Sequence, residues 1–244
     1  MRPDLEALVE ASRRLVDDVS GLRFAPPVTH VYNPLEYAWN AWQEYLDRFA
    51  TAPKRVVFLG MNPGPWGMAQ TGVPFGEVAA VRDWMGITAR IGVPAVIHEK
   101  RPVQGLACPR SEVSGRRLWG LMMDRFGDAP SFFQDHFVAN YCPLVFMGET
   151  GKNITPDKLP AAERNPLFAA CDRFLVETVS VLKPEVVIGI GVFARDRAAE
   201  ALSAMARPPR IETVLHPSPA SPAANRGWAE AATNKLTELG VWTT

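Results

Sequence analysis

The chain has 244 residues, and its 26 Lys and Arg balance its 26 Asp and Glu, so its formal net charge is zero. Hydrophobic residues make up 47% and charged residues 21%, which excludes disordered and fibrous classes. Zero net charge also excludes a strongly basic nucleic-acid binder, so any anion-binding surface must be local. We expect one domain over residues 1–244, with an N-terminal helical segment at about residues 1–50.

Cysteine use and the first residues indicate the compartment. The cysteines are Cys108, Cys142 and Cys171. Their wide spacing, without any C-x-x-C, predicts neither a disulfide framework nor an iron–sulfur cluster. Residues 1–20 alternate apolar and charged positions at helical spacing, unlike a signal peptide, and no apolar run approaches the roughly 18 residues of a membrane span. We expect a cytoplasmic protein, or a nuclear one if eukaryotic, with no membrane partner.

Short apolar runs alternate with helical patterns along the chain. The runs at residues 55–59, 137–141, 185–189 and 211–215 predict strands, and their lack of polar alternation favours a parallel sheet covered on both faces. Helices are predicted at residues 112–126 with Ser111 as the N-cap, at 165–182, and at 226–239. Strands alternating with helices predict an α/β fold. The Pro- and Gly-rich stretch at 63–109 breaks this rhythm, and loops of such length are usually functional.

Polar side chains follow three of the predicted strands. Asn62 comes just after the first strand, Asn140 closes the second, and His216 follows the fourth. Ligands of open parallel sheets bind beyond the carboxyl ends of the strands. We therefore expect these three residues to share one rim. For Asn62 alone, a purely local role, capping the backbone that follows it, explains the sequence equally well.

Two glycine-containing segments need separate interpretation. The Gly60–Gly64 loop lacks the lysine of a phosphate-binding loop, and its prolines remove backbone donors. Residues 189–194 match G-x-G-x-x-A at a strand–helix junction, with Glu212 as a loosely placed acid. This match leaves open a nicotinamide-dependent oxidoreductase using Gly189, Ile190 and Gly191. Close packing of a helix on a strand explains these glycines equally well.

The remaining candidates are a histidine and a basic stretch. His216 is fixed by the Pro-Ser-Pro that follows it, whereas His30, His98 and His136 show no metal-binding spacing, so no metal is expected. Residues 98–117 contain five basic residues against two acidic ones, a local excess of three. The basic residues are Lys100, Arg101, Arg110, Arg116 and Arg117. They form either a phosphate-facing patch or an ordinary solvated face.

Two longer motifs resemble a known family. Residues 60–76, GMNPGPWGMAQTGVPFG, resemble the first motif of the single-strand-selective monofunctional uracil-DNA glycosylases, and residues 216–228, HPSPASPAANRGW, are similar to their second. Residues 100–102 and 110–115, and Asn140 ahead of Cys-Pro-Leu, also match. The resemblance spans roughly residues 57–240. It implies the uracil-DNA glycosylase fold, a four-stranded parallel sheet between helices in a single domain.

The resemblance also implies roles for the rim residues. Asn62 would orient the attacking water, and His216 would stabilise the departing uracil anion at O2. Asn140 would read the Watson–Crick edge of uracil, and Phe75 would stack on the base. Gly64 would leave space at the 5-position. Met61 and Met68 complete the substrate-binding set.

The implied activity is excision of uracil and of 5-oxidised uracils, such as 5-hydroxymethyluracil, from single- and double-stranded DNA. The absence of lysine from both motifs fits a monofunctional enzyme that forms no Schiff base. No cofactor is expected, and the protein would act as a monomer. The residues expected to contact DNA are Lys100, Arg101, Pro217, Ser218, Pro219, Ala220 and Arg226. Animal members carry arginine at the position of Ala220, so the duplex wedge is in question, and a catalytically inactive nucleic-acid-binding module remains an alternative.

Overall fold

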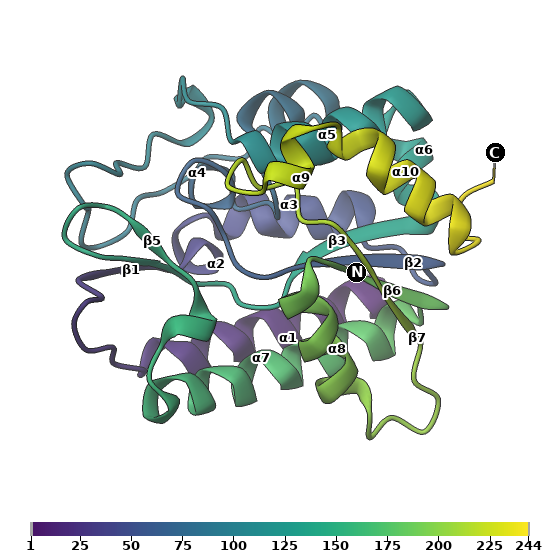
Figure 1. Ribbon diagram of the computed structural model, residues 1–244. Coiled ribbons are helices and arrows are strands. Elements are labelled where there is room, and N and C mark those ends of the chain that lie inside the picture. Colours follow the sequence, from purple (N-terminus) through teal and green to yellow (C-terminus); the bar gives the residue numbers. More distant parts are fainter. Residues whose placement is uncertain (1, 244) are drawn as a thin grey trace.

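A four-stranded parallel sheet forms the centre of the computed structural model, which describes residues 2–243 (Figure 1). Its strands are β2 (Val56–Gly60), β3 (His136–Asn140), β6 (Val186–Ile190) and β7 (Arg210–Val214), in the order β3-β2-β6-β7. Every neighbouring pair is parallel. The predicted fold class is confirmed, and each predicted strand is present with its bounds displaced by one residue.

Helices cover both faces of this sheet (Figure 1). On one face lie α1 (Pro3–Ser20), α7 (Ala161–Leu182) and α8 (Val192–Leu202). On the other lie α3 (Trp39–Phe49), α5 (Val113–Phe126), α6 (Ala129–Asp135) and α10 (Trp228–Glu238). Because both faces are covered, β2 and β6 contain no polar side chain, and β2, β3 and β6 are buried throughout, whereas the edge strand β7 is mostly half-buried. Among residues 2–243, no helix is long and apolar enough to cross a bilayer.

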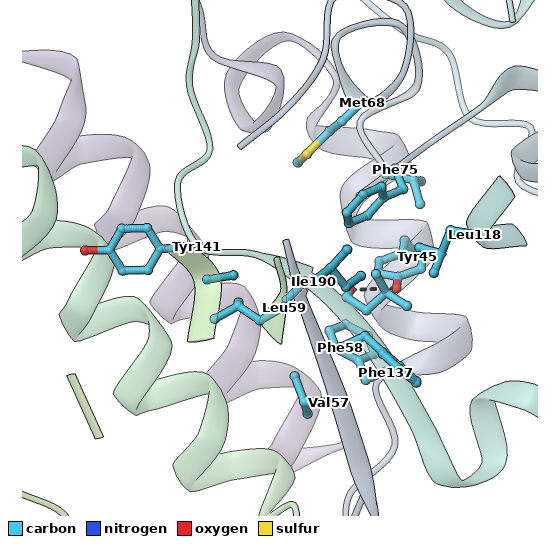
Figure 2. Packing of buried hydrophobic residues seen from close by; sticks show 14 of the residues in the cluster. Tyr45, Val57, Phe58, Leu59, Met68, Phe75, Leu118, Phe137, Tyr141 and Ile190 are labelled. Carbon is cyan, nitrogen blue, oxygen red and sulfur yellow. Dashed lines mark hydrogen bonds between the residues drawn. The ribbon is translucent and has the colours of Figure 1, made fainter. Parts of the chain in front are cut away.

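The core centres on the middle strands (Figure 2). Val57, Phe58 and Leu59 of β2 are at most 1% exposed and pack in one cluster with Phe137 of β3. The hydroxyl of Tyr45 on α3 donates a hydrogen bond to the carbonyl of Val138 at 2.8 Å, which anchors that helix to β3. The sheet is therefore a rigid base for the loops at its carboxyl edge.

A second, smaller sheet is present that the sequence did not predict. It is antiparallel and joins β1 (His30–Tyr32), β4 (Val145–Met147) and β5 (Asn153–Ile154) in the order β1-β4-β5. Strands of two or three residues are too short to show an alternating pattern, which explains the omission. The sheet lies beside the main one, near the segment that follows β3 (Figure 1).

Several predicted helix boundaries are wrong. Ser111 does not cap α5, because the helix begins at Val113 and Glu112 occupies the N-cap position without a capping side-chain bond. Helix α7 begins directly after Pro160, four residues before the predicted start. The pattern at 226–239 is interrupted at Gly227, whose φ of +132° no L-residue adopts easily and which separates α9 (Pro222–Asn225) from α10.

The stretch at 63–109 is more ordered than a single long loop. It contains α4 (Met68–Thr71), the π-helical turn η1 (Ala80–Trp84) and the 3₁₀ turn η2 (Gly105–Ala107). Two further short elements are α2 (Pro34–Tyr37) and the 3₁₀ turn η3 (Pro156–Lys158). These one-turn elements give too few residues for a helical period to be visible in the sequence.

Candidate active site

The parallel register brings the predicted rim residues together. Gly60, the last residue of β2, pairs with Asn140, the last residue of β3. Backbone bonds of 2.9 Å from Tyr141 to Gly60 and from Cys142 to Met61 continue this pairing beyond the strands. Asn62, Asn140 and His216 line one cavity of about 540 Å³, together with Met61, Gly64 and Phe75.

Asn62 is held by a bond across the cavity wall. Its Nδ2 donates to the carbonyl of Leu144 at 3.1 Å and lies 3.4 Å from the carbonyl of Pro63. Within residues 2–243 its side chain accepts no hydrogen bond from the following backbone, and the local bond to Pro63 accounts for only one of its two contacts. Oδ1 is left to accept a hydrogen bond from a molecule in the cavity.

Asn140 and Phe75 depend on a glycine between them. A Cβ added to Gly60 would overlap both the Oδ1 of Asn140 and the ring of Phe75. Nδ2 of the buried Asn140 lies 3.4 Å from the sulfur of Met68, so Met68 supports the asparagine and is not itself part of the cavity wall. Met68 and Phe75 lie at the same end of the buried cluster (Figure 2).

The backbone of Phe75 is strained and held in place. Its φ is +52°, in the left-handed region that non-glycine residues rarely adopt. Its carbonyl accepts hydrogen bonds from the indole of Trp119 at 3.0 Å and from the backbone N–H of Glu77 at 2.7 Å. These bonds fix the ring against the cavity. Strained backbone conformations cluster at functional sites, which favours a functional role for Phe75.

The rings of His216 and Phe75 both line the cavity and are tilted neighbours, with 6.1 Å between their centroids. Burial lowers its pKa below the ordinary histidine value, so the ring is neutral at neutral pH and has one N–H to donate. Within residues 2–243 its ring nitrogens have no hydrogen-bond partner, so this N–H is free for a ligand. Cβ of His216 would lie 3.2 Å from a Cβ on Gly191, whose φ is +93°.

This packing accounts for the glycines of the dinucleotide-like match. A Cβ on Gly189 would overlap the backbone of Arg195 in α8, and a Cβ on Gly191 would crowd His216. Gly189 therefore lets α8 pack closely on β6, and Gly191 lets the chain after β6 pack closely on His216.

The second motif is held by an arginine from α5. Arg117 donates to the carbonyl of Pro217 at 3.0 Å and to Oδ1 of Asn225 at 2.8 Å. Asn225 in turn donates to the carbonyl of Pro219 at 2.9 Å. The sequence left open whether Arg117 faces phosphate or solvent, and its guanidinium instead holds this loop in place.

Glu112 is a cavity residue that sequence reasoning missed. Its carboxyl packs against Gly64, Gly67 and Gly115. A Cβ on Gly64 or Gly67 would overlap a carboxyl oxygen, and a Cβ on Gly115 would lie 3.1 Å from Oε2. The Oε2 atom is buried without a hydrogen-bond partner. Burial and the negative charge of Glu77 raise the pKa of Glu112 to about 7. A cradle of glycines from separate segments leaves no periodic signal in the sequence.

Other expected and unexpected residues lie around the cavity. Ser218 and Pro219 line it, as do Trp66, Asn153 and Thr155, which the sequence did not predict. The remaining residues expected to contact DNA lie outside the lining: Lys100, Ala220 and Arg226 are exposed, Arg101 is half-buried, and Pro217 is buried. Within residues 2–243, no three His, Cys, Asp or Glu side chains are placed to hold a metal ion.

Comparison with known proteins gives a consistent result. Residues 47–237 match the model of the uracil DNA glycosylase superfamily. The chain is 48% identical over 236 residues to single-strand selective monofunctional uracil-DNA glycosylases of Rattus norvegicus and Bos taurus, covering 97% of this chain and 85% and 87% of theirs. The crystal structure of wild-type SMUG2 from Pedobacter heparinus has the same fold, with a TM-score of 0.70 at 16% identity, covering 99% of this chain and 98% of that one. The chain belongs to the uracil-DNA glycosylase superfamily and, within it, to the single-strand selective monofunctional family.

Proposed function

We propose that the protein is a monofunctional uracil-DNA glycosylase of base-excision repair. It hydrolyses the bond between uracil, or a 5-oxidised uracil, and deoxyribose in DNA and leaves an abasic site. The observation that carries this proposal is the convergence of Asn62, Asn140, His216 and Phe75 on one cavity. Family membership supports the same activity.

Asn62 orients the attacking water. In the reaction, water adds to the sugar carbon while the electron pair of the glycosidic bond leaves with uracil. Oδ1 of Asn62 accepts a hydrogen bond from the water, and the bond from its Nδ2 to Leu144 fixes the amide. An amide does not take up a proton at neutral pH, so its effect comes from positioning.

His216 stabilises the leaving group. Its neutral ring donates a hydrogen bond to O2 of uracil, where negative charge appears in the transition state. Because the ring has no hydrogen-bond partner within the described residues, binding breaks no existing bond.

Asn140 selects the base, and Phe75 stacks on it. Uracil presents an acceptor at O4 and a donor at N3, whereas cytosine presents the reverse. An amide with NH₂ toward O4 and Oδ1 toward N3 therefore fits uracil and opposes cytosine. Gly64 lines the cavity on the side that we assign to the 5-position of the base, and the carboxyl of Glu112 fills the space left by its missing Cβ. The backbone of Met61 contacts the pyrimidine.

The chemistry is hydrolytic, and the DNA contacts surround the cavity. No lysine lines the cavity among the described residues, which supports a reaction without a Schiff base. The second-motif loop and the segment around Lys100 and Arg101 contact the DNA, which is single- or double-stranded. We propose that the chain acts as one domain and as a monomer.

The test is a gel assay for abasic sites. A labelled single-stranded oligonucleotide with one uracil is incubated with the protein and treated with alkali. The proposal predicts cleavage at that position, none with cytosine or thymine in its place, and no strand break before alkali. An intact uracil oligonucleotide would indicate an inactive binding module, and fluorescence titration with a nicotinamide cofactor would test the oxidoreductase alternative.

A further inference from the structure

Two arginines stack on one tryptophan at the rim of the cavity. The indole of Trp66 lines the cavity, and the Cζ atoms of Arg101 and Arg110 lie 5.2 and 4.9 Å from the centroid of its ring. We call these two side chains the guanidinium pair. Contact with an aromatic ring attracts a guanidinium and restricts its motion, so both cations are held near the mouth of the cavity.

The guanidinium pair lacks an acidic partner. Within residues 2–243, neither Arg101 nor Arg110 forms an ion pair, although the net charge of the chain is zero. The arginines that do pair with carboxylates are Arg14, Arg48, Arg82, Arg173, Arg195, Arg197 and Arg210. Arg101 donates to the carbonyl of Lys100 at 2.8 Å, and its Nε is buried with no partner at all.

Such a site fits a phosphate. Guanidinium groups offer paired N–H donors that match phosphate oxygens, and restricting them beforehand lowers the entropic cost of binding. A nucleotide whose base enters the cavity remains attached to its strand through the phosphates on either side. These phosphates must therefore pass the cavity mouth, where Trp66 holds the guanidinium pair.

We propose that Arg101 and Arg110, held on Trp66, bind a backbone phosphate that flanks the flipped nucleotide, an inference that rests on the proposed function. The contact is to the strand that carries the uracil. It therefore acts in single-stranded and in paired DNA alike, and it depends on salt rather than on sequence.

The experiment measures binding by fluorescence anisotropy across a range of salt concentrations. The probe is a labelled single-stranded oligonucleotide containing 2′-fluoro-2′-deoxyuridine, whose fluorine disfavours positive charge on the sugar and slows cleavage. Losing one phosphate contact makes the negative slope of log affinity against log salt shallower by about 0.7 for a single strand. The double variant Arg101→Ala/Arg110→Ala removes both cations from the phosphate and should show this change. The ratio of wild-type to variant affinity should then be about 2.6-fold smaller at 200 mM than at 50 mM salt.

Two further variants sharpen the result. Arg13→Ala is a matched control, because Arg13 is exposed and stacks on Trp39 at 4.8 Å without an ion pair in the described chain, on α1. It should leave the slope unchanged. Trp66→Leu retains both charges but loses the ring, so affinity should fall while the slope stays near that of wild type.

The inference is overturned if the double variant Arg101→Ala/Arg110→Ala keeps the slope of wild type and of Arg13→Ala. This failure is distinct from failure of the proposed function, because the wild type would still produce abasic sites on uracil-containing DNA. Conversely, a changed slope without any excision would retain the phosphate site and reject the glycosylase.

Discussion

Replacing Glu112 with glutamine should change how stability depends on pH. The carboxyl lies against Gly64 and Gly67 with Oε2 unpartnered, and its pKa is raised to about 7 by burial and by Glu77. In the unfolded chain the same carboxyl ionises near 4.5. Between these two values the unfolded state releases its proton while the folded state retains it, so folding stability falls as pH rises through this window. Glutamine cannot ionise, and the fall should disappear.

The size of the effect follows from the two pKa values. The difference between 4.5 and about 7 corresponds to about 3 kcal/mol. Because Glu112 as a whole is only half-buried and faces the cavity, solvent screening reduces this value, and we expect about 1–3 kcal/mol. The loss of folding stability is complete above about pH 7 and absent below about pH 4.5.

Urea unfolding at pH 4 and pH 8 measures the prediction. The unfolding free energy of Glu112→Gln relative to wild type should rise by about 1–3 kcal/mol between these pH values. Any pH-independent effect of the substitution cancels in this comparison. Glu149→Gln, at an exposed glutamate, is the control and should show no such rise. A constant difference between Glu112→Gln and wild type at both pH values would refute the buried, protonated carboxyl.

Three other substitutions test the site. His216→Ala should raise the barrier of single-turnover excision by about 2–4 kcal/mol, the usual loss for a transition-state donor, in a variant whose circular dichroism matches wild type; full activity would remove His216 from the site. Asn140→Asp should reduce excision of uracil and admit cytosine, because a carboxylate accepts from N4 and no longer donates to O4; loss of uracil cleavage without any gain on cytosine would count against Asn140 as the reader. Ala220→Arg should lower the preference for single-stranded over paired uracil at one fixed salt concentration. The exposed alanine is too short to fill the gap left by a flipped nucleotide, whereas arginine is long enough. An unchanged ratio of single-stranded to paired cleavage would place the wedge elsewhere in residues 221–226.

The sheet and its rim were predictable because strand and polar residue are adjacent in the sequence. Asn62, Asn140 and His216 each lie at or just beyond the end of a predicted strand, and parallel strands bring their carboxyl ends to one edge. The structure confirms that they line one cavity. Their chemical roles stay predictions.

The other cavity residues lie in segments whose sequence shows no helical or strand periodicity. Asn153 and Thr155 belong to a region whose strand has two residues, and Glu112 reaches the cavity only because glycines in distant segments leave room for it. Arg117 shows the opposite difficulty. Its charge predicted a solvent-facing patch, whereas tertiary contacts commit it to carbonyls and an amide of the second motif.

The central claim is that Asn62 acts on the water and not on the fold or on DNA affinity. The direct measurement compares wild type and Asn62→Ala for single-turnover excision from a uracil oligonucleotide and for affinity to the 2′-fluoro analogue. We predict a rate lower by on the order of 100-fold with nearly unchanged affinity, because water positioning matters only along the reaction coordinate. Affinity that falls as far as the rate, or a rate that does not fall, would contradict the account.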